Sequence, residues 1–470
     1  METTSPTPIH LRTAAPPSTF HKLIWSRVFN ARQDHSILPF AYSQPSTASD
    51  VIAAVNFATL HSCRISIRSG GHSWAAWSVR HDAILIDLVD LDKSLPGGRT
   101  QFDASTQIVS CPPSITGEEL NNFLAERGRF FPGGHCPDVG LGGFILQGGM
   151  GWNCKSWGWA AEYVTSLDAV TASGEYLQHI SSSFHPDLFW AARGSGPGFP
   201  AVVTRFHLKT LPLPTLYQSL YFFPITSFKT ALQWLIDISP TTPDTEIVLV
   251  TSHFPSPSDP SPTVPSILAN FLAFSSSAAQ ILSTVHSSLP PNLIPLPHSK
   301  ISFPTTPSQQ YEAQRLANPL SHRYRSDNMY LPNNLTSIPS LLEPIFTSLP
   351  TPKSSALWFS MNPTSRKDLN GKEMALSMQT DHYVALYAVW GGEEDDDKCD
   401  DWIRRLGEEV QQNEGSYLGD ADFRFRDYAG WRFWNEGVKE KLDEVRKRWD
   451  AGGRVCAFLD DTEPSPASQD

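Results

Sequence analysis

Residues 131–151 read FPGGHCPDVGLGGFILQGGMG, a stretch crowded with glycine around one cysteine. Glycine at this density weakens any helix or strand and lets the backbone approach another group closely. Cys136 adds a nucleophile whose reactivity depends on its surroundings. The stretch therefore predicts a backbone cradle around a large ligand, with a thiol placed where it could bond to that ligand.

Two further glycine stretches occur on either side of this one. Residues 68–73 (RSGGHS) end the alternating run RISIR, and their N–H groups can bind phosphate as a nest. Residues 194–198 (GSGPG) lead into AVVTRFHLKTL, a β-rich run that we expect to pack over the same cradle. Taken singly, each stretch is equally an ordinary turn, His72 a surface histidine and Cys136 an inert thiol.

Bulk composition narrows the class of protein. A chain of 470 residues predicts two or three domains, and a formal charge of −12 argues against a nucleic-acid surface. The N-terminus lacks the apolar core of a secretory signal, and no run of about 18 apolar residues would span a membrane. Six cysteines are scattered without metal-ligand spacing. We expect a cytoplasmic protein with mostly free thiols and no metal.

Strands, glycine turns and helices recur up to about residue 210, which predicts an α+β unit. After Ser49, an apolar helical stripe contains Val51, Ala54, Val55 and Ala58. Residues 64–68 and 83–88 are expected strands. Thr116 and Glu119 form a capping box that predicts a helix through Leu124.

The second half of the chain has a different composition. Residues 254–308 are rich in Pro and Ser, poor material for helices and strands, yet contain the apolar islands ILANFLAF and AAQILSTV. The run YVALYAVW, residues 383–390, predicts a strand of a second sheet. GGEEDDDKCDD, residues 391–401, is expected to form a solvated acidic turn before a helix that begins at Trp402.

In this order and spacing, the three glycine stretches resemble the flavin domain of berberine-bridge-enzyme-like oxidases. These oxidases belong to the p-cresol methylhydroxylase/vanillyl-alcohol oxidase superfamily, and the variant here is similar to a fungal branch. The likeness extends to PSQQYEAQRLANPLSHRYRSDN, residues 307–328, and YLGDADF, residues 417–423. It implies a two-domain α+β PCMH-type flavoprotein. A discontinuous FAD-binding domain would span 1–215 and 415–470, with its core at 38–213. A substrate domain would span 216–414, with an antiparallel sheet backed by helices.

The resemblance also implies FAD attached covalently twice, through His72 to the 8α-methyl group and through Cys136 to C6. Two links would fix the ring and raise its reduction potential. The small Val139, three residues after the cysteine, would leave O2 room to reach the reduced flavin. Residues 157–162 would approach the ribose and adenine. The cofactor-binding residues carried over are Arg68, Ser69, Gly70, Gly71, His72, Ser73, Gly133, Cys136, Val139, Gly140, Gly143, Gly148, Gly149, Gly151, Trp157, Glu162, Val203 and Tyr417.

Removing hydride from a C–H group usually requires a base for a neighbouring proton. Tyr417 stands where relatives have a catalytic tyrosine, and it is our first candidate. Asp420 and Asp422 are alternative acid/base groups, or solvated turn residues. Tyr383, Tyr387 and residues 358–361 are candidates for the pocket wall, although buried sheet aromatics explain them equally well.

The function expected from the resemblance is an FAD-dependent, O2-using oxidation of a small organic molecule, in secondary-metabolite biosynthesis. Two alternatives stay open: oxidation of a sugar or alcohol, and a flavoprotein whose pocket guides a non-redox cyclisation. A scaffold without flavin would be at odds with the presence of both His72 and Cys136.

Overall fold

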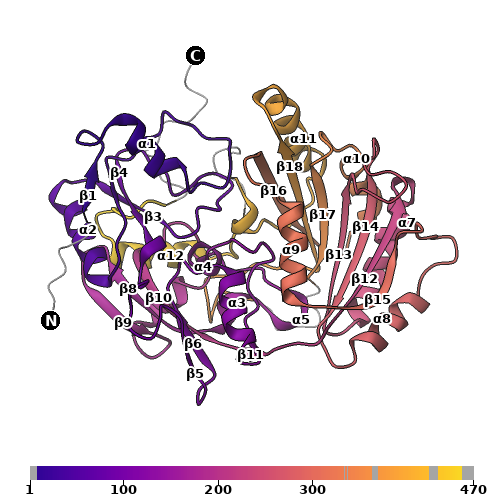
Figure 1. Cartoon of the computed structure of the whole chain (residues 1–470), viewed down its shortest axis with the longest axis horizontal. Coiled ribbons are helices and arrows are strands. Elements are labelled where there is room, and N and C mark those ends of the chain that lie inside the picture. The colour runs from indigo at the N-terminus through magenta and orange to yellow at the C-terminus, as the bar shows by residue number, and fades with distance from the viewer. Residues whose placement is uncertain (1–7, 333, 336, 362–368, 423–431, 458–470) are drawn as a thin grey trace.

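The computed structural model describes residues 8–332, 334–335, 337–361, 369–422 and 432–457. Its N-terminal part begins with a four-stranded sheet of order β1–β2–β4–β3, in which β2, β4 and β3 run parallel (Figure 1). The elements of this layer are β1 (Ile9–Leu11), α1 (Pro17–Trp25), β2 (Ala41–Ser43), α2 (Ala48–Leu60), β3 (Arg64–Arg68) and β4 (Ala83–Asp87).

A five-stranded antiparallel sheet of order β5–β6–β10–β8–β9 follows. Its strands are β5 (Gln101–Asp103), β6 (Ile108–Cys111), β8 (Val164–Thr171), β9 (Tyr176–Ile180) and β10 (Ala201–Lys209). The short strands β7 (Arg129–Phe130) and β11 (Leu211–Pro212) pair separately. The helices of this part are α3 (Gly117–Ala125), α4 (Leu141–Leu146), α5 (Cys154–Trp157), α6 (Pro186–Ala191) and α12 (Val438–Trp449).

The rest of the chain builds a seven-stranded antiparallel sheet of order β15–β12–β14–β13–β17–β18–β16. Its strands are β12 (Leu216–Pro224), β13 (Thr245–Ser252), β14 (Ser266–Ala273), β15 (Lys300–Thr305), β16 (Arg323–Leu331), β17 (Ser355–Ser360) and β18 (His382–Trp390). Four helices pack on one face: α7 (Phe228–Ile238), α8 (Ala278–Ser287), α10 (Ile338–Phe346) and α11 (Asp396–Glu409). The helix α9 (Pro307–Ala317), at the centre of Figure 1, packs instead against α3.

The opposite face of this sheet meets the N-terminal part. There, side chains of the sheet such as Tyr330, Phe359 and Tyr383 form one buried cluster with Trp159 and Tyr417. The antiparallel sheet with helices behind it confirms the predicted α+β architecture. It also places the aromatic strand residues over the glycine stretches.

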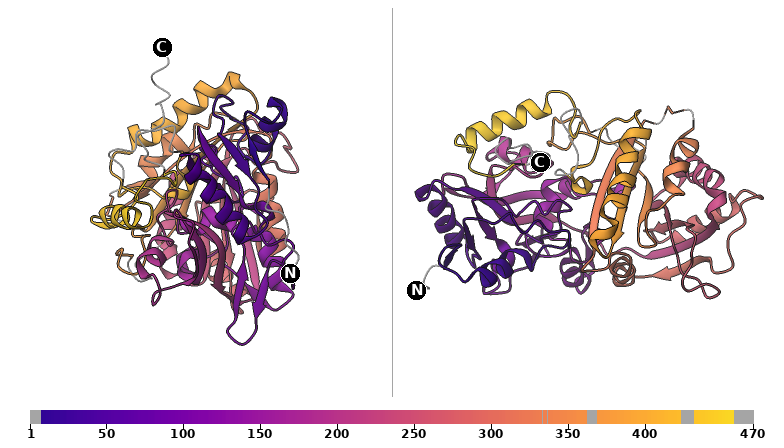
Figure 2. Two further views of the ribbon diagram at one scale, coloured as in Figure 1. Left: turned by 90° about the vertical axis from the view of Figure 1, so that its left-hand side faces the viewer. Right: turned by 90° about the horizontal axis from the view of Figure 1, so that it is seen from above.

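The end of the chain returns to the N-terminal part. Figure 2 shows α12 lying over that part, where Leu442 and Val445 join a core that includes Leu188 of α6. Farther on, Ile65 of β3 donates its N–H to the Arg454 carbonyl (2.7 Å) and accepts from the N–H of Cys456 (2.9 Å). The domain boundaries near residues 215 and 415 stay predictions.

The structure confirms some of the predicted local elements and corrects the start of one helix. The stripe on α2 is buried, and Thr116 and Glu119 form both halves of their capping box. The two apolar islands become β14 and α8 despite the surrounding Pro and Ser. The expected helix start at Trp402 is wrong: α11 begins at Asp396, because acidic side chains in a first turn favour the N-terminal end of a helix.

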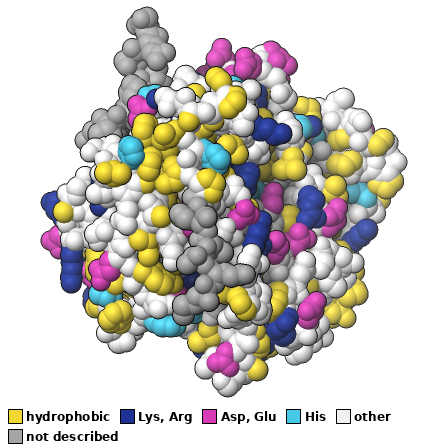
Figure 3. Space-filling model, turned by 60° about the vertical axis from the view of Figure 1, so that its left-hand side comes forward, with side chains coloured by type: hydrophobic (Ala, Val, Ile, Leu, Met, Phe, Trp, Pro, Cys, Tyr) yellow, Lys and Arg dark blue, Asp and Glu magenta, His cyan; other side chains and the backbone are white. Residues whose placement is uncertain are grey.

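The surface carries charges of both signs. Acidic and basic side chains are interspersed over the face in Figure 3. Among the described residues, no helix is both long and apolar enough to cross a membrane.

Candidate functional site

The first two glycine stretches meet backbone to backbone. A Cβ added at Gly70 would lie 2.6 Å from the nitrogen of Gly140, and one added at Gly140 would lie 2.7 Å from the nitrogen of Gly70. Ser69 Oγ accepts a hydrogen bond from the N–H of Gly142 (3.3 Å) and donates to the Pro113 carbonyl. Only glycine permits this approach, so the predicted RSGGHS turn and the start of α4 form one surface.

The remaining glycines close around the other end of α4. Gly148 and Gly149 have positive φ (+102° and +75°), and their carbonyls accept from Ala161 and Ala160, each at 2.9 Å. The third glycine stretch docks at the same end, where Gly194 and Gly196 both donate to the carbonyl of Leu146 (3.1 and 2.7 Å). All three predicted stretches therefore converge on one helix of six residues.

Two features of this surface suit a ligand. A Cβ added at Gly143 would meet nothing within 4 Å, so the α4 backbone is open to an incoming group there. The hydroxyl of Ser114, a residue 6% exposed, has no hydrogen-bond partner among the described residues. Its neighbours Pro113 and Ile115 accept the N–H groups of Gly142 and Leu141. A buried polar group without a partner is costly, and a polar ligand would satisfy it.

His72 and the Cys136 loop are joined through Asp138. The His72 ring stacks on Phe29 with centroids 4.0 Å apart, and its Nε2 lies 3.0 Å from Asp138 Oδ1. Burial alone would raise the pKa of Asp138, but the neighbouring imidazole outweighs this and lowers the pKa. Burial raises the pKa of the Cys136 thiol to about 12, with the Asp138 and Asp420 carboxylates adding to the effect. Cys136 is therefore a thiol, not a thiolate, at neutral pH.

An aromatic wall leads from His72 to Asp420. Phe29 contacts Trp74 with centroids 6.1 Å apart, and Trp74 contacts Tyr387 at 5.6 Å. Asp420 Oδ1 accepts from the indole N–H of Trp74 (3.3 Å), while Oδ2 accepts from the hydroxyls of Tyr383 (2.6 Å) and Tyr387 (3.0 Å). The aspartate is only partly buried, so one carboxylate is both held by three donors and accessible.

Tyr417 occupies a different place from the one expected of a base. Its hydroxyl oxygen accepts the N–H of Met150 at 3.2 Å, and Asn328 holds its backbone through two hydrogen bonds of 2.7 and 2.9 Å. Burial raises the pKa of Tyr417, and the charge of Asp420 raises it further. A tyrosine that stays protonated at neutral pH is a hydrogen-bonding group rather than a base.

Three of the predicted groups have their side-chain partners away from the glycine surface. The Arg68 guanidinium is fully buried against Asp87 (2.8 and 3.0 Å) and the carbonyls of Leu23 and Ile24, so its side chain does not reach a phosphate. Asp422, 2% exposed, is paired with Arg325 (2.5 Å) in a buried ion pair.

The third of these groups is the expected ribose and adenine segment, residues 157–162. The Trp157 ring packs edge-on against Phe274, the residue that follows β14, with ring centroids 4.8 Å apart. Glu162 accepts the N–H of Trp159 (2.8 Å) and so shapes its own turn. Val203 is a core residue of β10. Any cofactor contact by this set would come from its main chain.

The other predicted positions lie near the glycine surface. The carbonyl of Val139 accepts from Gly117 (3.2 Å) and that of Gly133 from Trp152 (3.1 Å). Gly151 has no room for a side chain, since an added Cβ would lie 2.1 Å from the Pro132 carbonyl. Ser73 Oγ accepts from Trp77 N–H (3.3 Å) within its own turn. A Cβ added at Gly71, whose φ is +80°, would lie 1.8 Å from the carbonyl oxygen of Arg27.

Sequence reasoning missed several groups beside its own candidates. Trp74 and Asp138 each lie two residues from a predicted attachment site, and that proximity was the available signal. His135, next to Cys136, contacts Glu246 of β13 through its Nε2 (2.9 Å) and so ties the cysteine loop to the seven-stranded sheet. Nothing in the sequence points to Glu246, which lies 111 positions from His135.

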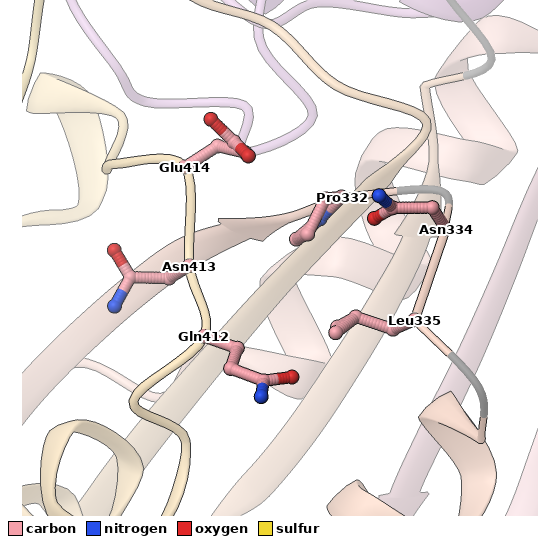
Figure 4. Close-up of a pocket in the computed structure, with 6 residues that line it drawn as sticks. All are labelled: Pro332, Asn334, Leu335, Gln412, Asn413 and Glu414. Carbon is pink, nitrogen blue, oxygen red and sulfur yellow. The ribbon is translucent and has the colours of Figure 1, made fainter.

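A separate polar pocket of about 360 Å³ lies on the surface (Figure 4). Two segments line it, one following β16 and one preceding Tyr417, with residues Pro332, Asn334, Leu335, Gln412, Asn413 and Glu414. None of the candidates His72, Cys136 and Asp420 lines this pocket.

Comparisons with known proteins identify the family and the fold. A family model described as an FAD binding domain matches residues 39–179. The FAD-linked oxidoreductase janO of Penicillium janthinellum is 36% identical over 455 residues, covering 95% of this chain and 96% of the relative. The solved structure of berberine bridge enzyme from Eschscholzia californica matches with a TM-score of 0.78 at 18% identity and covers 97% of each chain. The chain belongs to the FAD-linked oxidoreductases and has the fold of berberine bridge enzyme.

The oxidoreductase also matches a relative with a named sugar substrate. Xylooligosaccharide oxidase of Thermothelomyces thermophilus is 35% identical over 208 residues, which is 44% of this chain and 38% of that protein. The glycine surface fits FAD: the interlocked loops would hold its pyrophosphate and ring through main-chain N–H groups, and Ser114 would gain a polar partner. Bound there, FAD would supply a hydride acceptor.

Proposed function

We propose that this oxidoreductase uses O2 to oxidise a small organic molecule at carbon, with FAD attached through both His72 and Cys136. The support for double attachment is geometric. The loops that carry the two residues lie backbone to backbone through Gly70 and Gly140, and Asp138 bridges them at 3.0 Å from His72. Two links from one continuous surface would fix the ring in a single orientation.

The observation that carries the catalytic assignment is the coordination of Asp420. Its carboxylate is partly accessible and accepts from Tyr383, Tyr387 and Trp74, so its position is fixed. We therefore move the base from Tyr417 to Asp420. The carboxylate takes the proton that leaves as hydride departs from the adjacent carbon, and the two tyrosines hold it in place.

Tyr417 has a supporting part in this arrangement. Its hydroxyl stays protonated because burial and the Asp420 charge raise its pKa. Through Met150 N–H it fixes the glycine stretch at Gly148 and Gly149 below the seven-stranded sheet. It therefore orients the cofactor surface toward the substrate side.

The aromatic wall favours a planar or apolar substrate. Trp74 is central to this wall and also contacts Tyr324. Its ring centroid lies 5.4 Å from that of Tyr324 and 5.6 Å from that of Tyr387. Aromatic faces pack well against apolar ring systems, which suits the tailoring of a secondary metabolite. Oxidation of a sugar is the second candidate, because part of the chain matches a xylooligosaccharide oxidase.

The test is reduction of the bound flavin without oxygen. A panel of fused-ring aromatic alcohols and amines, alongside xylose oligosaccharides, is mixed anaerobically with the holoenzyme, and the visible flavin band is followed. Bleaching by the ring compounds alone supports the proposal, and bleaching by the sugars supports the second candidate. A compound that is converted while the flavin stays oxidised would show a non-redox pocket.

Oxygen use is tested separately by readmitting air to the reduced enzyme. We expect stoichiometric hydrogen peroxide and rapid return of the flavin band. Val139→Leu should slow that return while leaving the anaerobic reduction rate unchanged, since a bulkier side chain would fill the path of O2. Equal reoxidation rates in both proteins would remove Val139 from the oxygen path.

A further inference from the structure

One group of metal-binding side chains lies away from the glycine surface. Asp168 of β8, His179 of β9 and His207 of β10 each offer a ligand atom, and these atoms all lie within 4.8 Å of one another. The three residues come from neighbouring strands of the five-stranded sheet, whose edge strand is β9. The prediction of no metal considered the spacing of the cysteines. Asp168, His179 and His207 are spread over 40 positions of the sequence and become neighbours only when their strands pair.

The cluster lies on the face of the sheet opposite to α4. Strand residues alternate between faces, and Leu167, Phe206 and Leu208 point into the core that includes α4. Asp168 and His207 alternate with these residues and so point the other way. In Figure 1, β8, β9 and β10 lie in the half of the molecule away from the seven-stranded sheet.

Two irregularities of the sheet coincide at the cluster. The pairing of β8 with β9 shifts register between Leu167 and Ala169, the position of Asp168. The pairing of β10 with β8 shifts between His207 and Leu208. Bulges re-aim side chains and commonly mark sites of function, and here both shifts occur at members of the same trio.

His179 is held in an uncommon conformation beside them. Its φ of +54° is in the left-handed region, which is uncommon for residues other than glycine, although His, Asn and Asp enter it more often than most. The conformation is fixed by its own N–H, which donates to Asp168 Oδ1 at 2.8 Å. Its imidazole lies 4.9 Å from that of His207, centroid to centroid. The left-handed backbone of His179 and its bond to Asp168 thus place two imidazoles and a carboxylate side by side.

The spacing of Asp168 and His207 and the outer contact of His207 match a tetrahedral ion. Asp168 Oδ1 and His207 Nε2 are 3.3 Å apart, and ligand atoms in a tetrahedral zinc site are about 3.3 Å apart because Zn–N and Zn–O bonds are about 2.0–2.1 Å. His207 Nδ1 lies 2.7 Å from the Ser110 hydroxyl, which can accept its proton and leave Nε2 free for a metal. Such an outer hydrogen bond is typical of metal-bound histidine.

We propose that Asp168, His179 and His207 form a site for a divalent first-row transition ion, zinc above all, with water as the fourth ligand. Imidazole nitrogens favour such ions over Mg²⁺ or Ca²⁺, which prefer all-oxygen sites. The ion ties the edge strand β9 to the two strands beside it. The site is independent of the flavin surface.

The test measures metal binding directly on chelator-treated holoenzyme from which any purification tag has been removed. Zn²⁺ binding is followed by calorimetry, Co²⁺ binding by its visible absorption, and Mg²⁺ is the comparison ion. We expect one Zn²⁺ per chain, tetrahedral Co²⁺ absorption, and no Mg²⁺ binding at the same concentration. Ser110→Ala should weaken Zn²⁺ binding by about 10–100-fold, the usual cost of losing an outer hydrogen bond.

His179→Asn is the decisive variant, because Asn tolerates the left-handed backbone and the side chain is exposed. It should fold, keep its flavin and lose Zn²⁺ affinity by more than the Ser110 variant. His81→Asn is the matched control: His81 also contacts an aspartate, Asp82 at 2.9 Å, but is not part of the trio. Unchanged affinity in His179→Asn, no binding by the unaltered protein, or a cobalt–thiolate absorption that assigns the ion to cysteine would each overturn the proposal.

Discussion

Replacing Asp420 with Asn separates the catalytic assignment from a structural one. The substitution keeps the size of the side chain but removes its charge, and it places an amide where the hydroxyls of Tyr383 and Tyr387 now donate at 2.6 and 3.0 Å. Loss of a positioned base costs roughly 10²–10⁴-fold in the rate of the chemical step. One weakened hydrogen bond at this partly exposed site costs about 1 kcal/mol of folding free energy.

Asp422→Asn, two residues along, should give the opposite pattern. Asp422 and Arg325 are buried partners at 2.5 Å, and removing one partner of a buried ion pair costs about 3 kcal/mol. The assay is anaerobic flavin reduction by a compound that the unaltered enzyme oxidises, normalised to bound FAD, with chemical unfolding alongside. If Asp420→Asn reduces its flavin within a few-fold of the normal rate, Asp420 is not the base. If Asp422→Asn alone loses the rate, the roles are reversed.

Three further predictions rest on single residues. Gly143→Ala should not lower the unfolding temperature of flavin-free protein, because an added Cβ meets nothing within 4 Å and alanine favours a helix, but it should lower FAD incorporation. Gly391→Ala, equally open to an added Cβ, is the control and should leave FAD incorporation unchanged. Equal incorporation in the two variants would place the flavin elsewhere. Burial raises the pKa of Cys136 to about 12, so the reactive thiolate should become about tenfold more abundant for each pH unit between pH 7 and 9. In a His72→Ala protein reconstituted with FAD, attachment of the flavin to Cys136, followed by intact mass, should therefore speed up about tenfold per pH unit. An attachment rate that does not depend on pH would contradict this. Burial lowers the pKa of His382 to about 4, so between that pH and about 6.5 the histidine binds a proton in the unfolded chain but not in the folded one. The free energy of unfolding should therefore fall by about 2 kcal/mol from pH 7 to pH 5. Urea unfolding of His382→Gln should lack that pH dependence, and an unchanged dependence would assign it to other groups.

The parts of the fold that were predictable from sequence have local causes. The buried stripe of α2 and the capping box at Thr116 depend on residues within one or two turns. The glycine stretches were recognisable because a close backbone approach, such as that of Gly70 to Gly140, tolerates no side chain. The start of α11 was misplaced because a run of acidic residues reads equally as a turn and as a first helical turn.

The candidate site was harder to predict because its groups meet only through tertiary packing. Trp74, Tyr383 and Asp420 come from three separate parts of the chain, and no spacing rule joins them. Arg68 shows the converse limit: it adjoins the glycine turn in sequence, but its side chain points toward Asp87 on the neighbouring strand. A motif gives the position of a main chain more dependably than the direction of a long side chain.

We propose that FAD is attached covalently to both His72 and Cys136. The direct measurement is the intact mass and visible absorbance of denatured, acid-precipitated protein, for the unaltered chain, His72→Ala, Cys136→Ala and the double variant. We predict a yellow precipitate with the added mass of one FAD in the unaltered chain and in each single variant, and none in the double variant. A colourless precipitate from protein that is yellow when native would contradict covalent attachment and leave Cys136 as a packing residue.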